Sequence, residues 1–319
     1  MKQLKPWFQP TDSLRKLPKD KWHALMSREE HGFISRIVKD LQPKKILEVG
    51  VAYGGTTALL IKSLEMAGIE GEIFSVDLNS KFRGKKIGCM LKNINIPTNI
   101  KHSLTTGKLL KDCIEEIGEG IDLVVLDTSH NIPGEILEFL TVLPYMSKDG
   151  IVVLHDVHLS NLKAAIKKQA GRSLRKICPK VLFSTVSGEK FYNLEDEKGL
   201  YLSNIAAFKI NDSTFSKIED LFFSISHTWY DDWSKEVLDS YREYLSKYYS
   251  PQCLILWDLI ISNQQEYKEN IAIIRKYLSR LDKYYCRVES LRHRQGIVIR
   301  KIKSKIRNFV KSPYHNCHF

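Results

Sequence analysis

The stretch that decides the fold is Lys44-Lys45-Ile46-Leu47-Glu48-Val49-Gly50-Val51-Ala52-Tyr53-Gly54-Gly55-Thr56-Thr57. Its first half is rich in aliphatic residues that favour a buried strand. Gly50 and Gly54 follow, and glycine permits a tight turn in which the backbone approaches a ligand closely. An apolar run at 58–61 then starts a helical pattern. The order strand, glycine turn, helix is typical of ligand sites at the carboxyl ends of strands in open α/β sheets.

Three further apolar runs each end in an acidic residue. They are Glu72 to Asp77, Ile121 to Asp127 and Gly150 to Asp156. Continuous apolar runs of this length indicate strands of a parallel sheet that is buried on both faces, with helices between them. Because parallel strands bring their carboxyl ends to one edge of the sheet, the three acids are expected to meet there.

Together these segments resemble the class I S-adenosylmethionine-dependent methyltransferases. The resemblance rests on ILEVGVAYGGTT, IFSVDL, IDLVVLDTSHNIPGE and MSKDGIVVLHD and covers about residues 29–210. Its finer features are those of the O-methyltransferase branch that acts on sugars, macrolides and catechols. It implies a Rossmann-like, doubly wound α/β fold with a mostly parallel seven-stranded sheet, followed here by a helical C-terminal extension. It also implies S-adenosylmethionine as the methyl donor.

The donor site is expected at the glycine turn and the strand ends beside it. The turn would approach the methionine part of the donor, Glu48 would bind its amino group or brace the turn, and Asp77 would accept hydrogen bonds from the ribose. The expected donor-binding residues are Glu48, Gly50, Gly54, Gly55, Asp77 and Asp127. The spacing of Gly50 and Gly54, with Ala52 between them, differs from the dinucleotide fingerprint and argues against an NAD-dependent oxidoreductase.

Histidines accompany the acids at the ends of the later runs. Methylation of a hydroxyl requires removal of its proton, which a general base or a metal ion can achieve. The candidate catalytic residues are His155, His130, Asp127 and Asp156, with His158 beside them. In the metal-dependent branch that the chain resembles, Asp127 and Asp156 match the positions that ligate Mg²⁺. That branch commonly has Asp-Asp or Asp-Asn at the later position, whereas this chain has His155-Asp156 and lacks one oxygen ligand. A histidine base is therefore the alternative to a metal.

The patterns divide the chain into three regions. They are an N-terminal arm (1–28), a methyltransferase domain (29–210) and a helical extension (211–319). Prolines and aromatic residues in the arm suggest an extended segment packed on a surface. The last strands of the domain are expected at Val181 to Val186 and Ser203 to Lys209. Aromatic residues crowd the stretch from Trp229 to Tyr249, where helical spacing predicts a packed face, with a sugar-binding surface as the alternative.

The C-terminal part of the chain is strongly basic. The net charge is +12, and residues 275–311 contain 13 Lys or Arg against 2 acidic residues, so they account for +11 of it. Apolar residues recur at heptad spacing from Ile271 to Val288, which predicts a short helical seam through which the chain would form a homo-oligomer. From Ile297 to Lys311 the pattern predicts a basic amphipathic helix that binds an anionic membrane surface.

Other features of the sequence indicate where in the cell the protein is expected. The 6 cysteines are scattered without zinc or disulfide spacing, and no run of about 18 apolar residues occurs. We therefore expect a cytoplasmic enzyme, peripheral at the inner face of the cell membrane. Its expected acceptor is a sugar hydroxyl in a cell-surface or lipid-linked glycan, or in a glycosylated natural product. The alternative is a nucleic-acid-binding methyltransferase or a basic binding module, but the basic residues cluster outside the catalytic domain.

Overall fold

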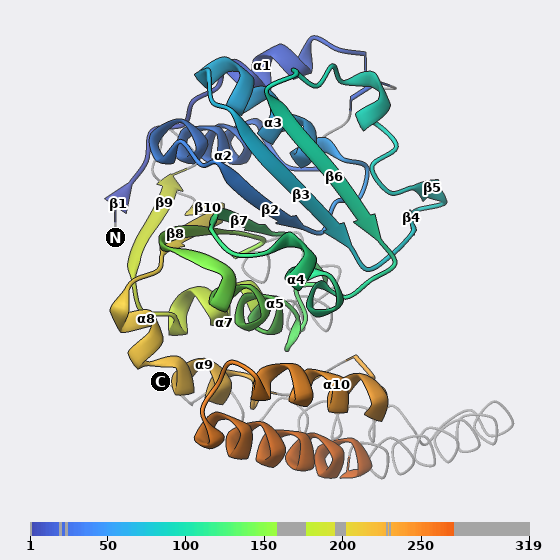
Figure 1. Cartoon of the computed structure of the whole chain (residues 1–319), viewed down its shortest axis with the longest axis vertical. Helices are drawn as coiled ribbons and strands as arrows, with labels where there is room; N and C mark the ends of the chain where they lie inside the picture. Colours follow the sequence, from blue (N-terminus) through green and yellow to red (C-terminus); the bar gives the residue numbers. More distant parts are fainter. Residues whose placement is uncertain are drawn as a thin grey trace, which may run out of the picture. The chain divides into compact units, whose positions relative to one another are not determined.

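The structure is a computed structural model of the 319-residue chain (Figure 1). It describes residues 2–18, 21–22, 25–157, 177–194, 202–227, 229 and 231–270. The chain forms two compact units, Met1–Ile261 and Ser262–Phe319. The first unit contains the sheet and the candidate site. Of the second unit, residues 262–270 are described, and they are helical.

The first unit is built on a sheet that has eight strands in the described part of the chain. In spatial order the strands are β1 (Lys2–Gln3), β9 (Glu189–Leu194), β10 (Leu202–Lys209), β8 (Met146–His155), β7 (Ile121–Leu126), β2 (Lys45–Val49), β3 (Gly71–Asp77) and β6 (Ile100–Thr106). Neighbouring strands are parallel, except that β10 runs antiparallel to both β8 and β9. A separate hairpin pairs β4 (Lys81–Phe82) with β5 (Lys85–Lys86).

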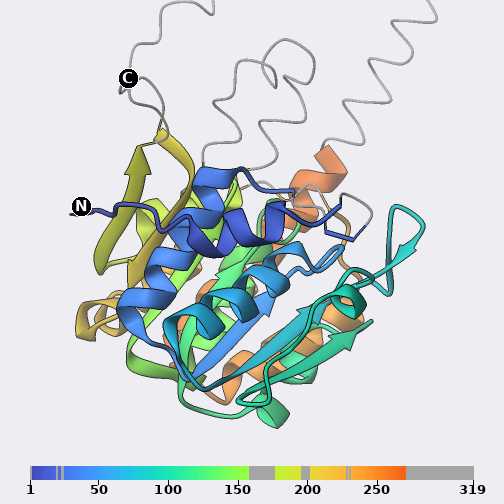
Figure 2. The ribbon, with the colours of Figure 1, turned by 90° about the horizontal axis from the view of Figure 1, so that it is seen from above.

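Helices cover both faces of this sheet, as Figures 1 and 2 show from two directions. One layer consists of α1 (Gln9–Arg15), α2 (Arg28–Leu41) and α3 (Gly55–Ala67). The opposite layer contains α4 (Ile114–Ile117), α5 (Gly134–Val142) and α7 (Cys178–Thr185). Later in the chain come α8 (Asp212–Ser216), α9 (Ile218–Ser224) and α10 (Lys235–Ser246). Short 3-10 turns are η1 (Leu91–Asn93), η2 (Leu110–Asp112) and η3 (Leu143–Tyr145).

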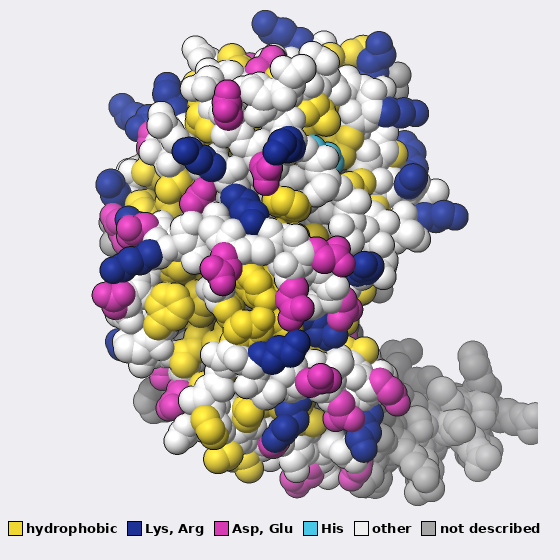
Figure 3. Space-filling model, viewed as in Figure 1, with side chains coloured by type: hydrophobic (Ala, Val, Ile, Leu, Met, Phe, Trp, Pro, Cys, Tyr) yellow, Lys and Arg dark blue, Asp and Glu magenta, His cyan; other side chains and the backbone are white. Residues whose placement is uncertain are grey.

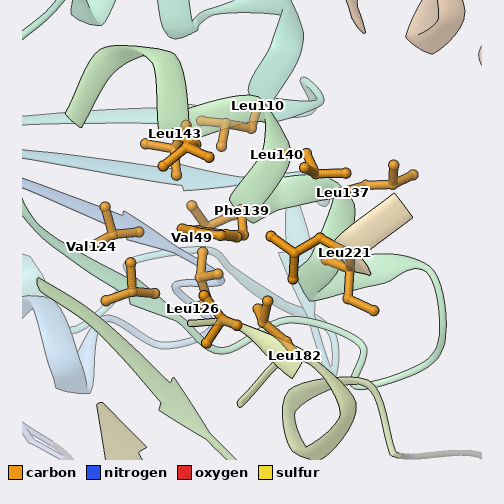
Figure 4. Close-up of a cluster of buried hydrophobic side chains, with 14 of the residues drawn as sticks. Val49, Leu110, Val124, Leu126, Leu137, Phe139, Leu140, Leu143, Leu182 and Leu221 are labelled. Carbon is orange, nitrogen blue, oxygen red and sulfur yellow. The ribbon is translucent and has the colours of Figure 1, made fainter. Parts of the chain in front are cut away.

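Strand side chains alternate between two hydrophobic clusters. In β7, Leu123 and Val125 belong to the cluster under α2 and α3, whereas Val124 and Leu126 belong to the cluster under α5 and α7. Figure 4 shows the second cluster, where side chains from α5 and from the strands converge. These four side chains of β7 are fully buried. Because each central strand buries both faces, its sequence is a continuous apolar run.

The expected doubly wound, mostly parallel α/β sheet is confirmed. Strands β2, β3, β7 and β8 lie where the four apolar runs predicted strands, and β10 lies at the expected last strand. The two-residue strand β1, from the N-terminal arm, pairs with β9 and adds an eighth strand at the edge.

Two local expectations are wrong. Val181 to Val186 is no strand, because these residues form most of helix α7 and its C-cap. Pro179 stands in the first turn of α7, where proline is favoured, and Cys178 and Leu182 are both buried on one face. A short apolar run does not distinguish a strand from a buried helix face. In the arm, Gln9–Arg15 is helical instead of extended.

The helices after the sheet extend the cluster under α5 and α7. Tyr241 and Tyr244 of α10 and Trp257 of the helical segment 251–261 are buried in it. Trp229 is buried there too, so the aromatic residues of this region mainly form a packed face, as their helical spacing predicts. On the surface seen in Figure 3, Lys and Arg side chains are interspersed with Asp and Glu.

Several expectations concern residues outside the described part of the chain. These are the heptad seam from Ile271 to Val288, the amphipathic tail from Ile297 to Lys311, and His158. In the described part of the chain, no helix has both the length and the apolar character that a membrane crossing needs.

Candidate active site

The strand order reverses between β2 and β7. From β2 the chain proceeds outward to β3 and β6, whereas β7 and β8 lie on the other side. At such a reversal an open α/β sheet has its ligand crevice, at the carboxyl ends of the strands. Gly50 follows β2 and has φ +92°. A Cβ atom at Gly50 would lie 1.9 Å from the backbone oxygen of Asp127, so only glycine fits where the two strand ends meet.

The glycine turn leads directly into helix α3. Gly54 has φ +90° and is the N-cap residue, and no side chain in the described part of the chain caps this helix end. A Cβ atom at Gly54 would lie 2.9 Å from Leu91 Cγ and 3.2 Å from Gly88 Cα. Gly55 is the first residue of α3 and is buried. The N–H groups of the first turn therefore have no capping side chain in the described part of the chain, an arrangement that suits a carboxylate ligand.

Glu48 lies under the turn and is fully buried. Its Oε2 accepts hydrogen bonds from Thr57 Oγ1 (2.6 Å) and Ser75 Oγ (2.7 Å). Its Oε1 is buried and has no hydrogen-bond partner among the described residues. Burial raises the pKa of Glu48 to about 7, and the charges of Asp127 and Asp77 act in the same direction. Glu48 thus braces β2, β3 and α3, and its second oxygen remains available to a cationic ligand.

Asp77 at the end of β3 holds the turn in place. Its Oδ2 accepts hydrogen bonds from the backbone N–H groups of Val51 (3.0 Å) and Ala52 (3.1 Å), and its Oδ1 accepts one from Asn79 (2.9 Å). Ala52 has φ +47°, an uncommon backbone conformation that these bonds help to fix. A carboxylate has about four acceptor positions, so Asp77 retains capacity for one ribose hydroxyl.

We expect Asp77→Ala to weaken binding of S-adenosylhomocysteine by about 1–3 kcal/mol, because one ribose hydroxyl and two turn N–H groups would lose their acceptor. Isothermal calorimetry on the folded variant measures this change. Asp77→Asn is the matched control, since it keeps the side-chain volume and one acceptor oxygen and should lose less affinity. Unchanged affinity in Asp77→Ala would remove Asp77 from the donor site.

His155 ends β8 and lies between two carboxylates. Its Nδ1 is 3.0 Å from Asp127 Oδ1, and its Nε2 is 3.4 Å from Glu30 Oε1. Glu30 belongs to the capping box of α2, in which its Oε2 accepts a hydrogen bond from the backbone N–H of Ser27 (2.6 Å). The capping box therefore fixes the carboxylate that faces His155.

His130 follows β7 and also lies between two carboxylates. Its Nδ1 is 2.9 Å from Glu135 Oε1, and its Nε2 is 3.0 Å from Asp156 Oδ2 and 3.5 Å from Asp127 Oδ1. Glu135 of α5 also accepts hydrogen bonds from the backbone N–H of His130 (2.9 Å) and from Thr128 Oγ1 (3.0 Å). Asp156 additionally accepts a hydrogen bond from Asn204 Nδ2. His130 and Asp156 have φ of +63° and +59°, and these uncommon backbone conformations turn both side chains into one group.

We call Glu30, Asp127, His130, Glu135, His155 and Asp156 the acid–histidine cluster. Burial disfavours the charge on His130, but the carboxylates of Asp156 and Glu135 outweigh it and raise its pKa to about 10. Burial likewise opposes a charge on His155. The carboxylate of Asp127, and to a smaller extent that of Glu30, outweighs burial and raises the pKa of His155 well above its ordinary value. Burial would raise the pKa of Asp156, but His130 and His155 lower it to about 2. Both shifts favour the imidazolium form of the ring.

The free energy of unfolding is expected to fall as the pH rises from 7 to 10 in the presence of a chelator. His130 has a pKa of about 10 in the folded chain against an ordinary 6.5, so the folded state binds more protons over this range. The stabilisation by protonated His130 is complete below pH 6.5. It is lost as the pH rises through about 10, the pKa of His130 in the folded chain. Urea unfolding at several pH values measures it, and His130→Gln, which cannot be protonated, should flatten the curve. An equal fall in both proteins would contradict the assignment.

The structure brings together all four of the expected catalytic residues that it describes, His155, His130, Asp127 and Asp156. Glu48, Gly50, Gly54, Gly55 and Asp77 line or support the adjoining glycine turn. Glu30 and Glu135 are not among the site residues predicted from the sequence. Glu30 comes from the helix before the first strand, and its only local signal is the capping box with Ser27. Glu135 lies five residues after His130, in the first turn of a helix. Acidic residues are common at this position because they stabilise the N-terminus of a helix, so Glu135 does not stand out in the sequence.

Residues 47–157 match a family model described as "Methyltransferase domain". No curated protein matches the chain. Similar solved structures include the SAH-bound methyltransferase PaMTH1 of Podospora anserina, with 15% identity and a TM-score of 0.44, covering 64% of this chain and 87% of that one. The O-methyltransferase TomG of Streptomyces achromogenes has 15% identity and a TM-score of 0.42, with the same coverage. An O-methyltransferase from Bacillus cereus has 15% identity and a TM-score of 0.41, covering 63% and 87%.

The family match spans the segment that contains the glycine turn, Asp77, Asp127 and His155. The sheet order and the switch-point crevice are those of the Rossmann-like methyltransferase type. The first unit therefore contains a class I methyltransferase domain, and the protein is an S-adenosylmethionine-dependent methyltransferase.

Proposed function

We propose that this enzyme transfers a methyl group to a hydroxyl oxygen, and that the acceptor is a sugar of a glycan or of a glycosylated natural product. The observation that carries the first part is the acid–histidine cluster beside the glycine turn. A hydroxyl is a weak nucleophile until its proton is removed, and this cluster concentrates groups that can accept or stabilise that proton. The sugar is inferred from the resemblance of the sequence to the branch that methylates sugars, macrolides and catechols.

The turn and the strand-end acids supply what the donor requires. S-adenosylmethionine provides an activated methyl group on a positively charged sulfonium. Gly50 and Gly54 leave room for close approach, the N-terminal turn of α3 suits the donor carboxylate, and the unpaired Oε1 of Glu48 suits the amino group. Asp77 is assigned to the ribose. The carboxylates Glu48, Asp77 and Asp127 give the crevice a negative potential that favours a cationic donor.

Proton removal is assigned to the acid–histidine cluster. Glu135 holds Nδ1 of His130, which leaves Nε2 directed toward Asp127 and Asp156. This arrangement, a carboxylate behind an imidazole, orients the ring and fixes its tautomer. His155 is held in the same way by Glu30 and faces Asp127. An acceptor hydroxyl at this position would pass its proton to Nε2 of His130 in the neutral form of that ring, while its oxygen attacks the methyl carbon in line. The carbon–sulfur bond of the sulfonium breaks, which yields a methyl ether and S-adenosylhomocysteine.

Polar side chains lie next to His130 in the described part of the chain, and we assign them to the acceptor. Asn131, beside His130, donates a hydrogen bond from Nδ2 to Asp231 Oδ2 (2.9 Å), so the loop after β7 contacts the segment before α10. Asp231 is exposed, and Trp233 nearby is half-buried. Carboxylates beside an aromatic ring suit a ligand with hydroxyls and C–H faces, and this supports a sugar acceptor.

The test is transfer of label from tritiated S-adenosylmethionine to a panel of acceptors. The panel contains nucleotide-linked sugars, lipid-linked sugars, a glycosylated macrolide, a catechol and RNA. The proposal expects label in a sugar product that survives alkali, because a methyl ether resists hydrolysis and a methyl ester does not. Label in RNA, or an alkali-labile product alone, would contradict it.

The tail remains a proposed membrane contact. Five cations occupy one side of the predicted amphipathic helix, and each adds about 1 kcal/mol near an anionic surface. They are Arg300, Lys301, Lys303, Lys305 and Arg307. Replacing these five by Gln should abolish co-sedimentation of the full chain with anionic vesicles, with neutral vesicles as the control. Equal partitioning of both proteins would remove the tail as an anchor.

A further inference from the structure

Residues 78–111 are strongly basic, although they belong to the catalytic domain. They contain 8 Lys or Arg residues and no Asp or Glu, whereas the net charge of the chain outside residues 275–311 is only +1. Four of these cations form most of the β4–β5 hairpin, and all four are exposed: Lys81, Arg83, Lys85 and Lys86. The hairpin projects from the body of the first unit in Figures 1 and 2, and Lys and Arg side chains gather at the same edge in Figure 3. The donor does not account for them, because S-adenosylmethionine carries a positive sulfonium and no phosphate.

The hairpin places its cations where they lower its own stability. Lys81 and Lys86 lie directly opposite each other in the antiparallel pair, and like charges in this arrangement repel. Arg83 and Gly84 form a two-residue turn with φ of +46° and +80°, a conformation in which Asn or Gly is the usual first residue. No carboxylate of the described residues forms an ion pair with any of the four cations. Sequence choices that oppose stability are expected where they serve a function, and a negatively charged partner would offset this repulsion.

The cations stand on a packed support that is joined to the glycine turn. The rings of Phe82 and Tyr53 pack edge to face, with their centroids 5.1 Å apart. The Arg83 guanidinium lies 5.1 Å from the centroid of the Phe82 ring, and Lys85 Nζ lies 5.7 Å from that of the Tyr53 ring. Tyr53 belongs to the glycine turn, and its backbone oxygen accepts a hydrogen bond from the N–H of Met90 (3.1 Å), shortly after the hairpin. A surface bound by the hairpin would therefore lie beside the turn to which we assign the donor.

The form of the hairpin indicates the kind of partner. A small phosphorylated ligand is normally held in a concave site, whereas this hairpin projects. Proteins that bind single-stranded nucleic acid stack its bases on free aromatic faces, but the rings of Phe82 and Tyr53 pack on each other beneath two cations. A bilayer with anionic lipids offers an extended negative surface that a projecting cluster of four cations can reach.

We propose that the β4–β5 hairpin docks on the anionic headgroups of a lipid bilayer. This contact goes beyond the proposed function and does not depend on it, because headgroup binding requires neither donor nor acceptor. It is also separate from the tail contact, since the hairpin belongs to the first unit. Stable anchoring at a membrane commonly takes two signals, and the hairpin and the tail would supply one each. The glycine turn would then lie next to the bilayer, where a lipid-linked sugar is found.

The test is co-sedimentation of the full-length protein with vesicles of phosphatidylcholine, with and without phosphatidylglycerol. The hairpin variant combines Lys81→Gln, Arg83→Gln, Lys85→Gln and Lys86→Gln. Its charge-matched control changes four exposed lysines elsewhere in the first unit and combines Lys16→Gln, Lys148→Gln, Lys217→Gln and Lys235→Gln. Each cation at an anionic surface strengthens binding about fivefold, so the hairpin variant should bind the anionic vesicles at least about tenfold more weakly than the control. The control should stay within about threefold of the wild type, because charges away from the surface are screened by salt.

Arg83→Asn separates docking from a structural role of this residue. Asn is favoured at the first position of such a turn, so the variant should have a higher free energy of unfolding in urea, while its binding to anionic vesicles falls about fivefold. A structural role of Arg83 would have the opposite effect on stability. Calorimetry with S-adenosylhomocysteine checks the fold of each variant, and the affinity should equal that of the wild type because no hairpin side chain is assigned to the donor.

Three results would overturn the proposal. Equal binding to anionic vesicles by the hairpin variant and the charge-matched control would show that the hairpin makes no contact of its own. Binding of a single-stranded RNA that falls in the hairpin variant, while vesicle binding does not, would assign the cations to nucleic acid. Loss of S-adenosylhomocysteine affinity in a folded hairpin variant would assign them to the donor. If the hairpin variant does not fold, vesicle binding by Arg83→Asn decides. Failure of the docking proposal would leave methyl transfer to a hydroxyl intact, since the labelling screen measures that separately.

Discussion

His155→Ala is expected to lower turnover by about 100-fold or more while binding of S-adenosylhomocysteine survives. His155 contacts the carboxylates of Asp127 and Glu30 and lies outside the glycine turn to which we assign the donor. General acid–base groups typically contribute about 10²–10⁴ to the rate, and loss of a metal ligand would have a comparable effect. The measurement is single-turnover methyl transfer to the acceptor identified by the labelling screen, together with calorimetry of donor binding.

Two comparisons make this result specific. His227→Ala should retain the turnover of the wild type, since His227 is exposed and outside the cluster. His130→Ala should be impaired to a similar degree, because His130 contacts Asp127 and Asp156. The role of His155 would be contradicted if His155→Ala had nearly the turnover of the wild type while a chelator inactivated the enzyme and Mg²⁺ restored it. That result would favour magnesium held by Asp127 and Asp156.

Gly50→Ala is expected to abolish donor binding and to lower the free energy of unfolding by about 3 kcal/mol or more. The added Cβ would lie 1.9 Å from the backbone oxygen of Asp127, and neither atom can move without separating the ends of β2 and β7. The φ of +92° adds a conformational cost. Calorimetry with S-adenosylhomocysteine and urea unfolding measure the two effects.

Gly84→Ala is the matched control for this substitution. Gly84 lies in the β4–β5 hairpin with φ +80°, and a Cβ atom there would meet nothing within 4 Å. Gly84→Ala is therefore expected to show the cost of a positive φ, about 1 kcal/mol, without a steric clash of the added Cβ atom. If Gly50→Ala were no more destabilising than Gly84→Ala and still bound the donor, the close approach of β2 and β7 would be wrong.

The sheet could be predicted because its strands are marked by local patterns. Apolar runs such as Ile121–Leu126 are buried on both faces, so hydrophobicity alone identifies them, and an acid directly after the run identifies the ligand edge. Helix α7 could not be predicted in the same way. Its apolar residues are too few to establish a period, and the strand that follows, β9, begins with Glu189 and Lys190, which carry no apolar signal.

The site could be predicted only where its residues follow strands. Asp127, His130, His155 and Asp156 share that property, and parallel strands bring them together. Glu30 and Glu135 come from helices, and their contacts with the histidines depend on how α2 and α5 pack on the sheet. Asp77 has a further role that its position did not predict, because its carboxylate binds the N–H groups of Val51 and Ala52 and so supports the turn as well.

Calorimetric titration of the full-length protein with S-adenosylhomocysteine, and in parallel with NAD, tests the central claim most directly. The claim is that the crevice formed by Gly50, Asp77 and Asp127 holds a methyl donor. We predict one S-adenosylhomocysteine per chain, weakened by Asp77→Ala and abolished by Gly50→Ala, and no heat from NAD. Binding of NAD without binding of S-adenosylhomocysteine would contradict the account.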